Sequence, residues 1–304
     1  MKPDGGKGQI GLSGQSGWDG RAGWDGQGDW EDRPALVACD LDGTLLDGEG
    51  APLAGMRETV AELVAAGVVV VVCSGRPAGA TRTAAARLGL RCGLAIGYHG
   101  AVVLDLADGR WVRRLDLPPK SVGMLVGALR DAGAGVTAYV DDERLVQAGP
   151  EATAAKRDAP VAARVCRDLA WALEDAPVTR LIVEPDAGSP VGPLLRLAAR
   201  WPEVAMSPAP GGRFEVHHAG ADKRSALAEV CRMLAVPAGA VVACGDGPDD
   251  AAMLRWAGLG VAVAEGDRES CAAAAVIVGR ADLAGFLRDL AGGGAASAPT
   301  SPAR

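Results

Sequence analysis

The chain has 304 residues, of which 49% are hydrophobic but only 4% aromatic. This composition predicts one large or two modest domains with cores of aliphatic side chains. The formal net charge of −7 argues against nucleic acid or an anionic membrane as a partner, because phosphate-rich surfaces attract basic proteins. No apolar run is long enough to span a bilayer, and the amino terminus lacks the apolar core of a signal peptide, so we expect a cytoplasmic protein.

Both ends of the chain read as tails. Residues 1–33 are Gly-rich and polar, and Gly17-Trp18-Asp19-Gly20 is followed by a near copy, Gly23-Trp24-Asp25-Gly26. Neither a strand period nor a helix period runs through this segment. We predict disorder for residues 1–33 and 291–304.

From residue 35 onward, apolar strands alternate with amphipathic helices. The predicted strands are Ala35–Cys39, Val68–Cys73, Leu94–Ile96, Val102–Leu104, Ala240–Cys244, Gly260–Val263 and Val276–Val278. The predicted helices are Pro52–Ala66, Ala78–Leu88, Asp222–Leu234, Asp249–Trp256 and Ala281–Leu290. Such alternation predicts a doubly wound parallel α/β sheet with right-handed crossovers, built from residues 34–106 and 215–290.

The interval 107–214 has a different rhythm and predicts a second, α+β unit inserted into the first. Its predicted helices are Pro119–Ala132, an Ala-rich segment over 151–175 broken at Pro160, and Val191–Arg200. Its predicted strands are Val136–Val140 and Leu145–Gln147, which form a hairpin, and Arg180–Glu184, Val204–Met206 and Arg213–His217. The joints are expected near Ala107–Gly109 and Pro210–Gly212.

Two carboxylates follow the first predicted strand directly. Asp40 and Asp42 are two residues apart on extended chain, so their side chains can face one small volume, and Gly43 then lets the chain turn. Two like charges about 4 Å apart repel by roughly 4 kcal/mol at an effective dielectric near 20, so such a pair favours a bound cation. Taken alone, an acidic turn after a strand is the more common explanation.

Polar residues also follow other predicted strands. In Ser74-Gly75-Arg76-Pro77, backbone N–H groups at the start of a helix suit an anion. The three acids of Gly245-Asp246-Gly247-Pro248-Asp249-Asp250 suit a hard cation such as Mg²⁺. Lys223 opens a helix, where its charge opposes the helix dipole. Each pattern alone also fits an ordinary turn or a surface residue.

In order, DLDGTLL from residue 40, SGRP from residue 74, Lys223 before a helix and GDGPDDAAML from residue 245 resemble the haloacid dehalogenase-like (HAD) superfamily of aspartate-nucleophile phosphatases. The inserted unit is similar to the α/β (type IIB) cap of the Cof-type sugar-phosphatase branch. Further similar stretches are Tyr98–Ala101, Phe214–Val216 and Gly260–Val263. The resemblance covers residues 34–290 and implies a HAD-like core with an inserted cap domain.

The resemblance also implies a mechanism. Asp40 would be the nucleophile that forms an aspartyl-phosphate, Asp42 the general acid and base, and Lys223 the cation that neutralises charge at the phosphoryl group. The phosphate-binding residues would be Thr44, Ser74, Gly75 and Arg76. The ligands of a required Mg²⁺ would be Asp40, the backbone carbonyl of Asp42, Asp246 and Asp250, with Asp250 either ligating or orienting.

Three residues depart from the family pattern. Asp249 and His99 each stand where the family commonly has Asn, and Glu265 stands where a Gly-Asn pair supplies an Asn. The extra negative charge of Asp249 either weakens phosphate binding or adds a metal ligand. None of the three replaces a catalytic residue, so these departures bear on substrate contacts.

The first functional hypothesis is a Mg²⁺-dependent phosphatase acting on a small phosphorylated metabolite, with a sugar phosphate as the favoured class. The second is a phosphotransferase or phosphohexomutase using the same aspartyl-phosphate. A non-catalytic metabolite-binding regulator is the third, motivated by Asp249 and His99. Arg144, Arg180 and Arg213 of the cap are candidate contacts to the leaving group, although each also fits a solvated surface position. The sequence does not predict the physiological substrate or the oligomeric state.

Seven cysteines without a CxxC pair fit neither a disulfide framework nor a zinc ribbon. Cys39, Cys73 and Cys244 lie near the ends of predicted strands and are expected to be small core residues. A redox switch beside the active site is the alternative. The expected strand order places Cys39 near Cys73 or Cys244.

Overall fold

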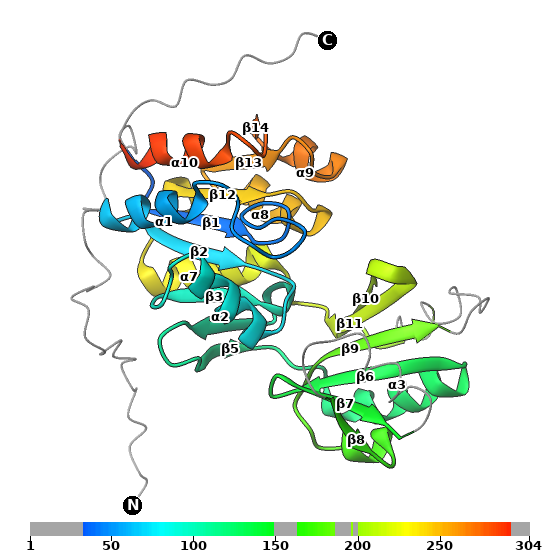
Figure 1. The fold of residues 1–304 in the computed structure, drawn as a ribbon. Coiled ribbons are helices and arrows are strands. Elements are labelled where there is room, and N and C mark those ends of the chain that lie inside the picture. Colours follow the sequence, from blue (N-terminus) through cyan, green and yellow to red (C-terminus); the bar gives the residue numbers. More distant parts are fainter. Residues whose placement is uncertain (1–32, 149–162, 186–195, 197–199, 293–304) are drawn as a thin grey trace, which may run out of the picture.

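The computed structural model describes residues 33–148, 163–185, 196 and 200–292. Nearly all of both predicted tails lies outside these residues, as do most of the predicted helix Val191–Arg200 and the first part of the segment 151–175. The described residues form two units, each built on its own sheet (Figure 1).

The larger unit is built on an eight-stranded sheet of order β14-β13-β12-β1-β2-β3-β4-β5. Its strands are β1 (Leu36–Asp40), β2 (Val69–Cys73), β3 (Leu94–Gly97), β4 (Val102–Asp105), β5 (Trp111–Arg114), β12 (Val241–Gly245), β13 (Leu259–Val263) and β14 (Val276–Val278). All neighbours pair in parallel except β3 with β4 and β4 with β5. The central strand β1 is buried along its whole length, as expected of a sheet covered on both faces.

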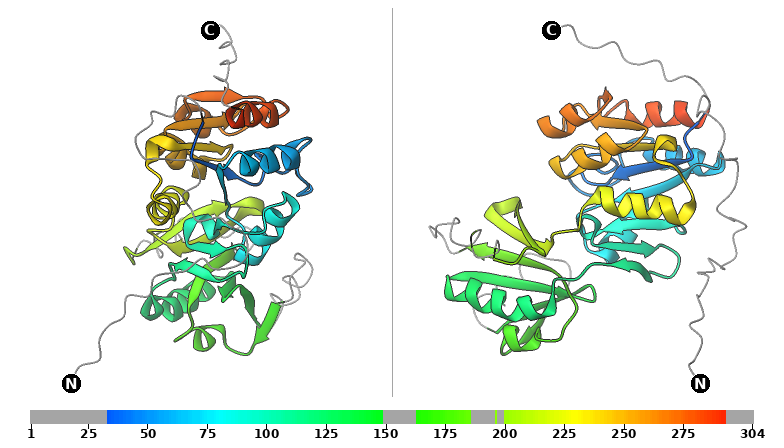
Figure 2. Two further views of the ribbon diagram at one scale, coloured as in Figure 1. Left: turned by 90° about the vertical axis from the view of Figure 1, so that its left-hand side faces the viewer. Right: turned by 180° about the vertical axis from the view of Figure 1, so that it is seen from behind.

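Helices cover both faces of this sheet. They are α1 (Met56–Ala65), α2 (Ala78–Arg87), α7 (Lys223–Leu234), α8 (Ala251–Trp256), α9 (Arg268–Ala273) and α10 (Leu283–Ala291). Val37 and Cys39 of β1 pack with residues of α1, α2 and α10, whereas Leu36 and Ala38 pack with residues of α7 and α8. Figure 2 shows the two helix layers on opposite sides of the sheet. The predicted doubly wound α/β core is therefore confirmed.

The cap is built on a six-stranded sheet of order β10-β11-β9-β6-β7-β8. Its strands are β6 (Ala134–Val140), β7 (Glu143–Gln147), β8 (Ala163–Cys166), β9 (Val178–Pro185), β10 (Val204–Ala209) and β11 (Arg213–His218). The helices α3 (Pro119–Asp131) and α5 (Leu169–Ala172) cover one face, where they share an apolar core with the sheet. The predicted hairpin is present, and Asp141 and Asp142 form its tip with positive φ angles of 49° and 68°.

Sheet membership differs from the predicted boundaries at both joints. β5 pairs with β4 in the core sheet, so the core continues to Arg114 rather than ending at residue 106. β11 pairs with β9 and β10 in the cap sheet, so the cap continues to His218 rather than ending at residue 214. β5 is a half-buried edge strand without apolar alternation, which is why the sequence pattern does not reveal it.

One secondary-structure prediction is wrong. Ala163–Cys166 was expected to be helical, but it forms β8 and pairs in parallel with β7. Pairing with a neighbouring strand has overridden the helical preference of an Ala-rich segment. Within the described ranges, no helix has the length and apolar character needed to cross a membrane.

Candidate active site

The register of the central strands brings the expected motifs to one edge of the core sheet. Asp40 at the end of β1 lies beside Cys73 at the end of β2, and Cys39 lies beside Cys244 of β12. Because these strands are parallel, the residues that follow them share the carboxyl edge of the sheet, where open α/β sheets bind ligands. The cap sheet lies beyond this edge (Figure 1).

Three carboxylates converge there. Asp40, Asp246 and Asp250 each offer an oxygen, and these oxygens lie within 4.8 Å of one another. Asp40 is 6% exposed and Asp250 is fully buried. Burial raises the pKa of Asp40 well above its usual range, and Asp250 adds to the rise, while Lys223 opposes it. Burial likewise raises the pKa of Asp246.

Lys223 lies at the centre of the acidic residues. Its Nζ donates to Asp40 Oδ1 at 2.7 Å and to Asp250 Oδ1 at 2.7 Å, and it lies 2.9 Å from Asp249 Oδ2. Burial would lower the pKa of this ammonium, but the surrounding carboxylates raise it well above its usual value. These contacts explain why a lysine is stable in the first turn of a helix.

The acidic loop after β12 is held by its own backbone and by the loop after β1. Asp250 Oδ2 accepts from the backbone N–H groups of Asp246 at 3.0 Å and Gly247 at 2.9 Å. Thr44 Oγ1 donates to Asp246 Oδ1 at 2.8 Å. Gly43 has a φ of +88°, and a Cβ there would lie 2.2 Å from Asp246 Oδ2. The close approach of the two loops therefore depends on glycine at this position.

The side chain of Asp42 lies outside the acidic cluster. It forms a bidentate ion pair with Arg76, in which Arg76 Nε donates to Asp42 Oδ2 at 2.7 Å and Nη2 contacts Oδ1. Its side chain is 54% exposed. The expected metal ligand at this position was the backbone carbonyl, so the outward side chain is compatible with that prediction.

The turn after β2 is contacted from both units. Ser74 is buried, its Oγ accepts from Arg76 N at 3.1 Å, and its backbone carbonyl accepts from His99 N at 3.0 Å. Arg180 of β9 in the cap donates to the Gly75 carbonyl at 2.9 Å. A side chain of the cap therefore touches the expected phosphate-binding turn.

Of the three candidate cap arginines, the structure brings Arg180 to the site. Its guanidinium lies 3.1 Å from Glu215 Oε1, and its Cζ lies 4.9 Å from the ring centroid of Tyr98 and 4.4 Å from that of Tyr139. Arg213 instead faces Glu184 in an exposed pair, and Arg144 is buried on β7.

Sequence reasoning did not single out Glu215 as a site residue. The alternation in β11, which buries Phe214 and Val216, places Glu215 on the opposite face of the strand, and this pattern was available in the sequence.

The three departures from the family pattern occupy two different places. His99 Nδ1 lies 3.0 Å from Asp249 Oδ2, so two of them contact each other. The third, Glu265, accepts from the backbone N–H of Arg280 at 2.9 Å, and Arg280 Nε donates to the Gly43 carbonyl at 2.9 Å. Glu265 therefore supports the Gly43 turn through Arg280.

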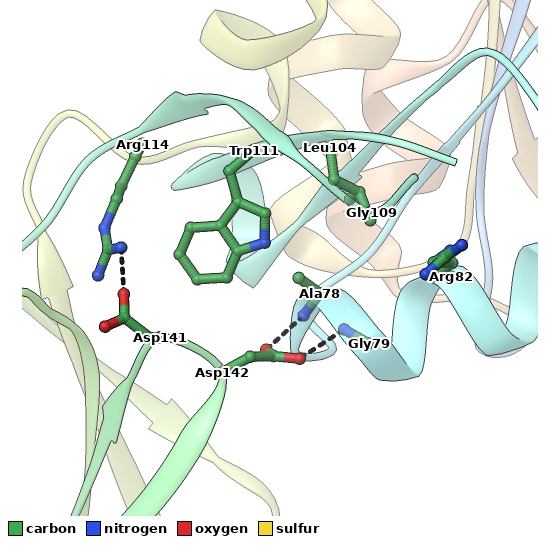
Figure 3. A pocket seen from close by; sticks show the side chains of 9 residues that line it. All are labelled: Ala78, Gly79, Arg82, Leu104, Gly109, Trp111, Arg114, Asp141 and Asp142. Carbon is green, nitrogen blue, oxygen red and sulfur yellow. Dashed lines mark hydrogen bonds and ion pairs between the residues drawn. The ribbon is translucent and has the colours of Figure 1, made fainter. Parts of the chain in front are cut away.

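A cavity of about 460 Å³ lies where the cap hairpin meets the core (Figure 3). It is lined by Ala78, Gly79, Arg82, Leu104, Gly109, Trp111, Arg114, Asp141 and Asp142. None of the acidic cluster residues lines it. Its charged groups are paired with each other or with backbone, as in the Arg114–Asp141 contact and the hydrogen bonds from Ala78 N and Gly79 N to Asp142.

Cys39 lies close to Cys244, as expected, because the two are register partners on β1 and β12. Cys39, Cys73 and Cys244 are all buried. The hydrogen bond with Cys244 and burial raise the pKa of Cys39 well above its usual value. A buried thiol that resists ionisation is a poor nucleophile, which favours the core role over the redox role.

A family model described as haloacid dehalogenase-like hydrolase matches residues 37–289. A phosphoglycolate phosphatase of Natronomonas pharaonis is 31% identical over 173 residues, which cover 56% of this chain and 74% of the relative. The 5-amino-6-(5-phospho-D-ribitylamino)uracil phosphatase YitU of Bacillus subtilis is 27% identical over 251 residues, which cover 78% of this chain and 88% of the relative.

Solved structures show the same fold. TM0651 from Thermotoga maritima matches with a TM-score of 0.75 at 23% identity, over 84% of this chain and 96% of that one. The HAD subclass IIB sugar phosphatase BT4131 matches with a TM-score of 0.67 at 17% identity, over 84% of this chain and 97% of that one. The chain belongs to the haloacid dehalogenase-like hydrolases, in their Cof-type branch, and is a phosphoric monoester hydrolase.

Proposed function

We propose that the protein is a Mg²⁺-dependent phosphatase that hydrolyses a small phosphorylated metabolite, with a sugar phosphate as the favoured class, through an aspartyl-phosphate on Asp40. The observation that carries this proposal is the buried Asp40 carboxylate, which contacts Lys223 at 2.7 Å and lies in one cluster with Asp246 and Asp250.

The donor set of the site fits Mg²⁺. The ammonium of Lys223 contacts Asp40, Asp249 and Asp250, and Asp246 lies in one cluster with Asp40 and Asp250, so carboxylates outnumber the ammonium. Carboxylate and carbonyl oxygens are the ligands that this hard cation prefers. Asp40, Asp246, Asp250 and the backbone carbonyl of Asp42 would hold it. When bound, Mg²⁺ would screen the repulsion between the Asp40 carboxylate and a phosphate dianion.

The chain's own residues then divide the work of phosphoryl transfer. Asp40 would attack phosphorus, so that a bond from its free oxygen forms as the ester bond breaks. Asp42, once released from its pair with Arg76, would protonate the departing alkoxide and later take a proton from the water that cleaves the aspartyl-phosphate. Lys223 would neutralise charge on Asp40 and the phosphoryl group.

The phosphate oxygens would be held by the turns around the cluster. The Ser74 hydroxyl and the backbone N–H groups near Thr44 and Gly75 are the proposed donors. Arg180 places a cap side chain on the Gly75 carbonyl, at the position where a leaving group would meet the cap. Water exclusion by the cap would favour transfer of the phosphoryl group to Asp40.

Relatives support a small substrate, since their names specify phosphoglycolate and a phosphoribityl pyrimidine, and BT4131 is a sugar phosphatase. The regulator hypothesis was based on Asp249 and His99 as departures from the family pattern. These two residues contact each other, so the extra negative charge of Asp249 is paired and no longer supports a non-catalytic role. A mutase would use the same aspartyl-phosphate. It differs from a phosphatase in its products, because it forms a phosphorylated isomer and a phosphatase releases inorganic phosphate.

The test is phosphate release from a panel of phosphorylated sugars and other metabolites, with Mg²⁺ and with a chelator. We expect release only with Mg²⁺, and a loss of about 10³-fold or more in Asp40→Asn. Asp47→Asn is the matched control, because Asp47 lies in the same loop and only caps its local turn. Full activity in Asp40→Asn would refute the proposal, and isomer interconversion without phosphate release would identify a mutase.

A further inference from the structure

The contact between His99 and Asp249 joins two loops that lie far apart in the sequence. His99 belongs to the single turn η1 (Tyr98–Gly100) after β3, and Asp249 to the turn η4 (Pro248–Asp250) after β12. The imidazole Nδ1 lies 3.0 Å from Asp249 Oδ2. That same carboxylate oxygen lies 2.9 Å from Lys223 Nζ, and Lys223 in turn touches Asp40. Asp249 is therefore two contacts from the nucleophile.

Both ring nitrogens of His99 face carboxylates. The second nitrogen, Nε2, lies 3.1 Å from Glu215 Oε2 on the cap strand β11. An ionised carboxylate beside each ring nitrogen favours the doubly protonated ring, so the ring is an imidazolium. The raised pKa of His99, about 9, agrees with this geometry, since its two carboxylate partners outweigh the effect of burial.

The imidazole ring is fixed against the Ser74–Gly75 turn. A Cβ on Gly75 would lie 2.2 Å from His99 Cε1, so the ring packs directly on the backbone there. His99 itself has a φ of +53°, and its N–H donates to the Ser74 carbonyl at 3.0 Å. The backbone of the proposed phosphate-binding turn therefore holds the imidazole ring of His99 in position.

Charge in the site depends on this ring. Lys223 supplies one positive charge to Asp40, Asp249 and Asp250, and Arg180 supplies one to Glu215. Without His99, the Asp249 carboxylate would add uncompensated negative charge beside the place where a phosphate dianion must bind. It would also compete with the phosphoryl group for Lys223.

We propose that His99 is a positioning residue that cancels the charge of Asp249 and orients it, so that Lys223 remains available to Asp40 and the phosphoryl group. This proposal rests on the proposed function, because it assumes that a phosphate dianion binds at Asp40. Removing His99 leaves an uncompensated charge, whereas removing both charges restores the balance.

The test is a double-mutant cycle with His99→Asn, Asp249→Asn and the double variant. Asn tolerates the positive φ of His99 and keeps the size of Asp249. The measurements are kcat and KM on an accepted substrate, and the affinity for inorganic phosphate in the presence of Mg²⁺ by calorimetry. We expect His99→Asn to weaken phosphate binding about tenfold. The double variant is expected to bind phosphate within about threefold of the wild type.

His218→Asn is the matched control, since the His218 ring accepts a local hydrogen bond from Gly220 N. This variant is expected to leave kcat, KM and the affinity for inorganic phosphate unchanged. A double variant as weak as the product of the two single effects would overturn the proposal, because a purely structural role gives additive losses. Melting temperatures of the wild type and the four variants identify any variant that fails to fold.

Failure of the proposed function has a different signature. A wild-type protein that binds phosphate but releases none from any substrate would refute the proposed catalysis. If the double variant still recovers phosphate affinity in that case, the proposed role of His99 stands. A protein that neither hydrolyses phosphate esters nor binds phosphate would refute both. Hydrolysis by the wild type, together with a double variant that does not recover phosphate affinity, would refute the proposed role of His99 alone.

Discussion

Gly43 lies where the loop after β1 packs against Asp246 of the loop after β12. Its φ of +88° is costly for any side chain, and an added Cβ would lie 2.2 Å from Asp246 Oδ2. We therefore predict that Gly43→Ala displaces the Asp246 carboxylate and lowers kcat/KM by about 100-fold, with weaker Mg²⁺ activation. Steady-state assays at several Mg²⁺ concentrations check this. Gly48→Ala in the same loop is the control, because a Cβ there meets nothing within 4 Å.

Residue chemistry at the strand ends is largely readable from the sequence, because each polar motif directly follows an apolar strand. Asp40 and Asp246 meet as the strand pattern indicates, and the same pattern brings Cys39 beside Cys244. The contact of His99 with Asp249 was not predictable, since the two positions are 150 residues apart and no periodicity links them. Side-chain contacts of this kind depend on loop geometry, which a single sequence does not specify.

At the scale of elements, the tip of the β6–β7 hairpin docks on the start of α2. Asp142 accepts from the backbone N–H groups of Ala78 at 2.9 Å and Gly79 at 2.6 Å (Figure 3). It also accepts from the Tyr98 hydroxyl at 2.6 Å. A cap residue thus supplies the acceptor for the first N–H groups of a core helix, whose own N-cap is Pro77.

We predict that Asp142→Asn lowers the free energy of unfolding by about 1 kcal/mol, because the charge and one acceptor are lost while the positive φ is tolerated. Urea unfolding measures this change. Glu143→Gln, which alters an exposed charge one residue later, is the control and should leave stability within about 0.5 kcal/mol. Equal stability of Asp142→Asn and the wild type would show that this contact adds nothing to cap docking.

Elements were predicted well where they are buried, whereas two edge strands, β5 and β8, were missed. The apolar runs of β1, β2 and β12 leave little choice, since their residues are almost all buried. The edge strands β5 and β8 are half-exposed and carry no alternation, so their pairing was invisible in the pattern. The predicted boundaries between core and cap were misplaced for a related reason. Each boundary depends on which sheet β5 or β11 pairs with, and the sequence pattern does not reveal that pairing.

At the scale of the whole molecule, charged contacts close the cap on the core. His99 and Asp249 belong to the core, whereas Glu215 and Arg180 belong to the cap. The groups facing His99 are therefore Asp249 and Glu215 as direct partners, with His217 and Arg180 nearby on β11 and β9. The charge of His99 is therefore one of the contributions that hold the cap on the core.

This arrangement predicts that His99 makes a pH-dependent contribution to the free energy of unfolding, and that replacing His99 removes this contribution. The pKa of His99 is raised from 6.5 to about 9, so its contribution is complete below about pH 6.5 and is lost as pH rises through about 9. The pKa of Glu215 is lowered, because His99 and Arg180 outweigh its burial, so its charge persists below its usual titration range. The pair should therefore be intact between about pH 5 and 8.

The measurement is the difference in unfolding free energy between wild type and His99→Asn from pH 6 to pH 10. Taking the difference cancels the lysines, tyrosines and cysteines that titrate identically in both proteins. We expect a difference of about 1 kcal/mol near pH 6.5, reduced by solvent screening of a partly exposed ring, that falls towards zero by pH 10. A difference that stays constant across this range would mean that His99 stabilises the closed cap through packing rather than through its charge.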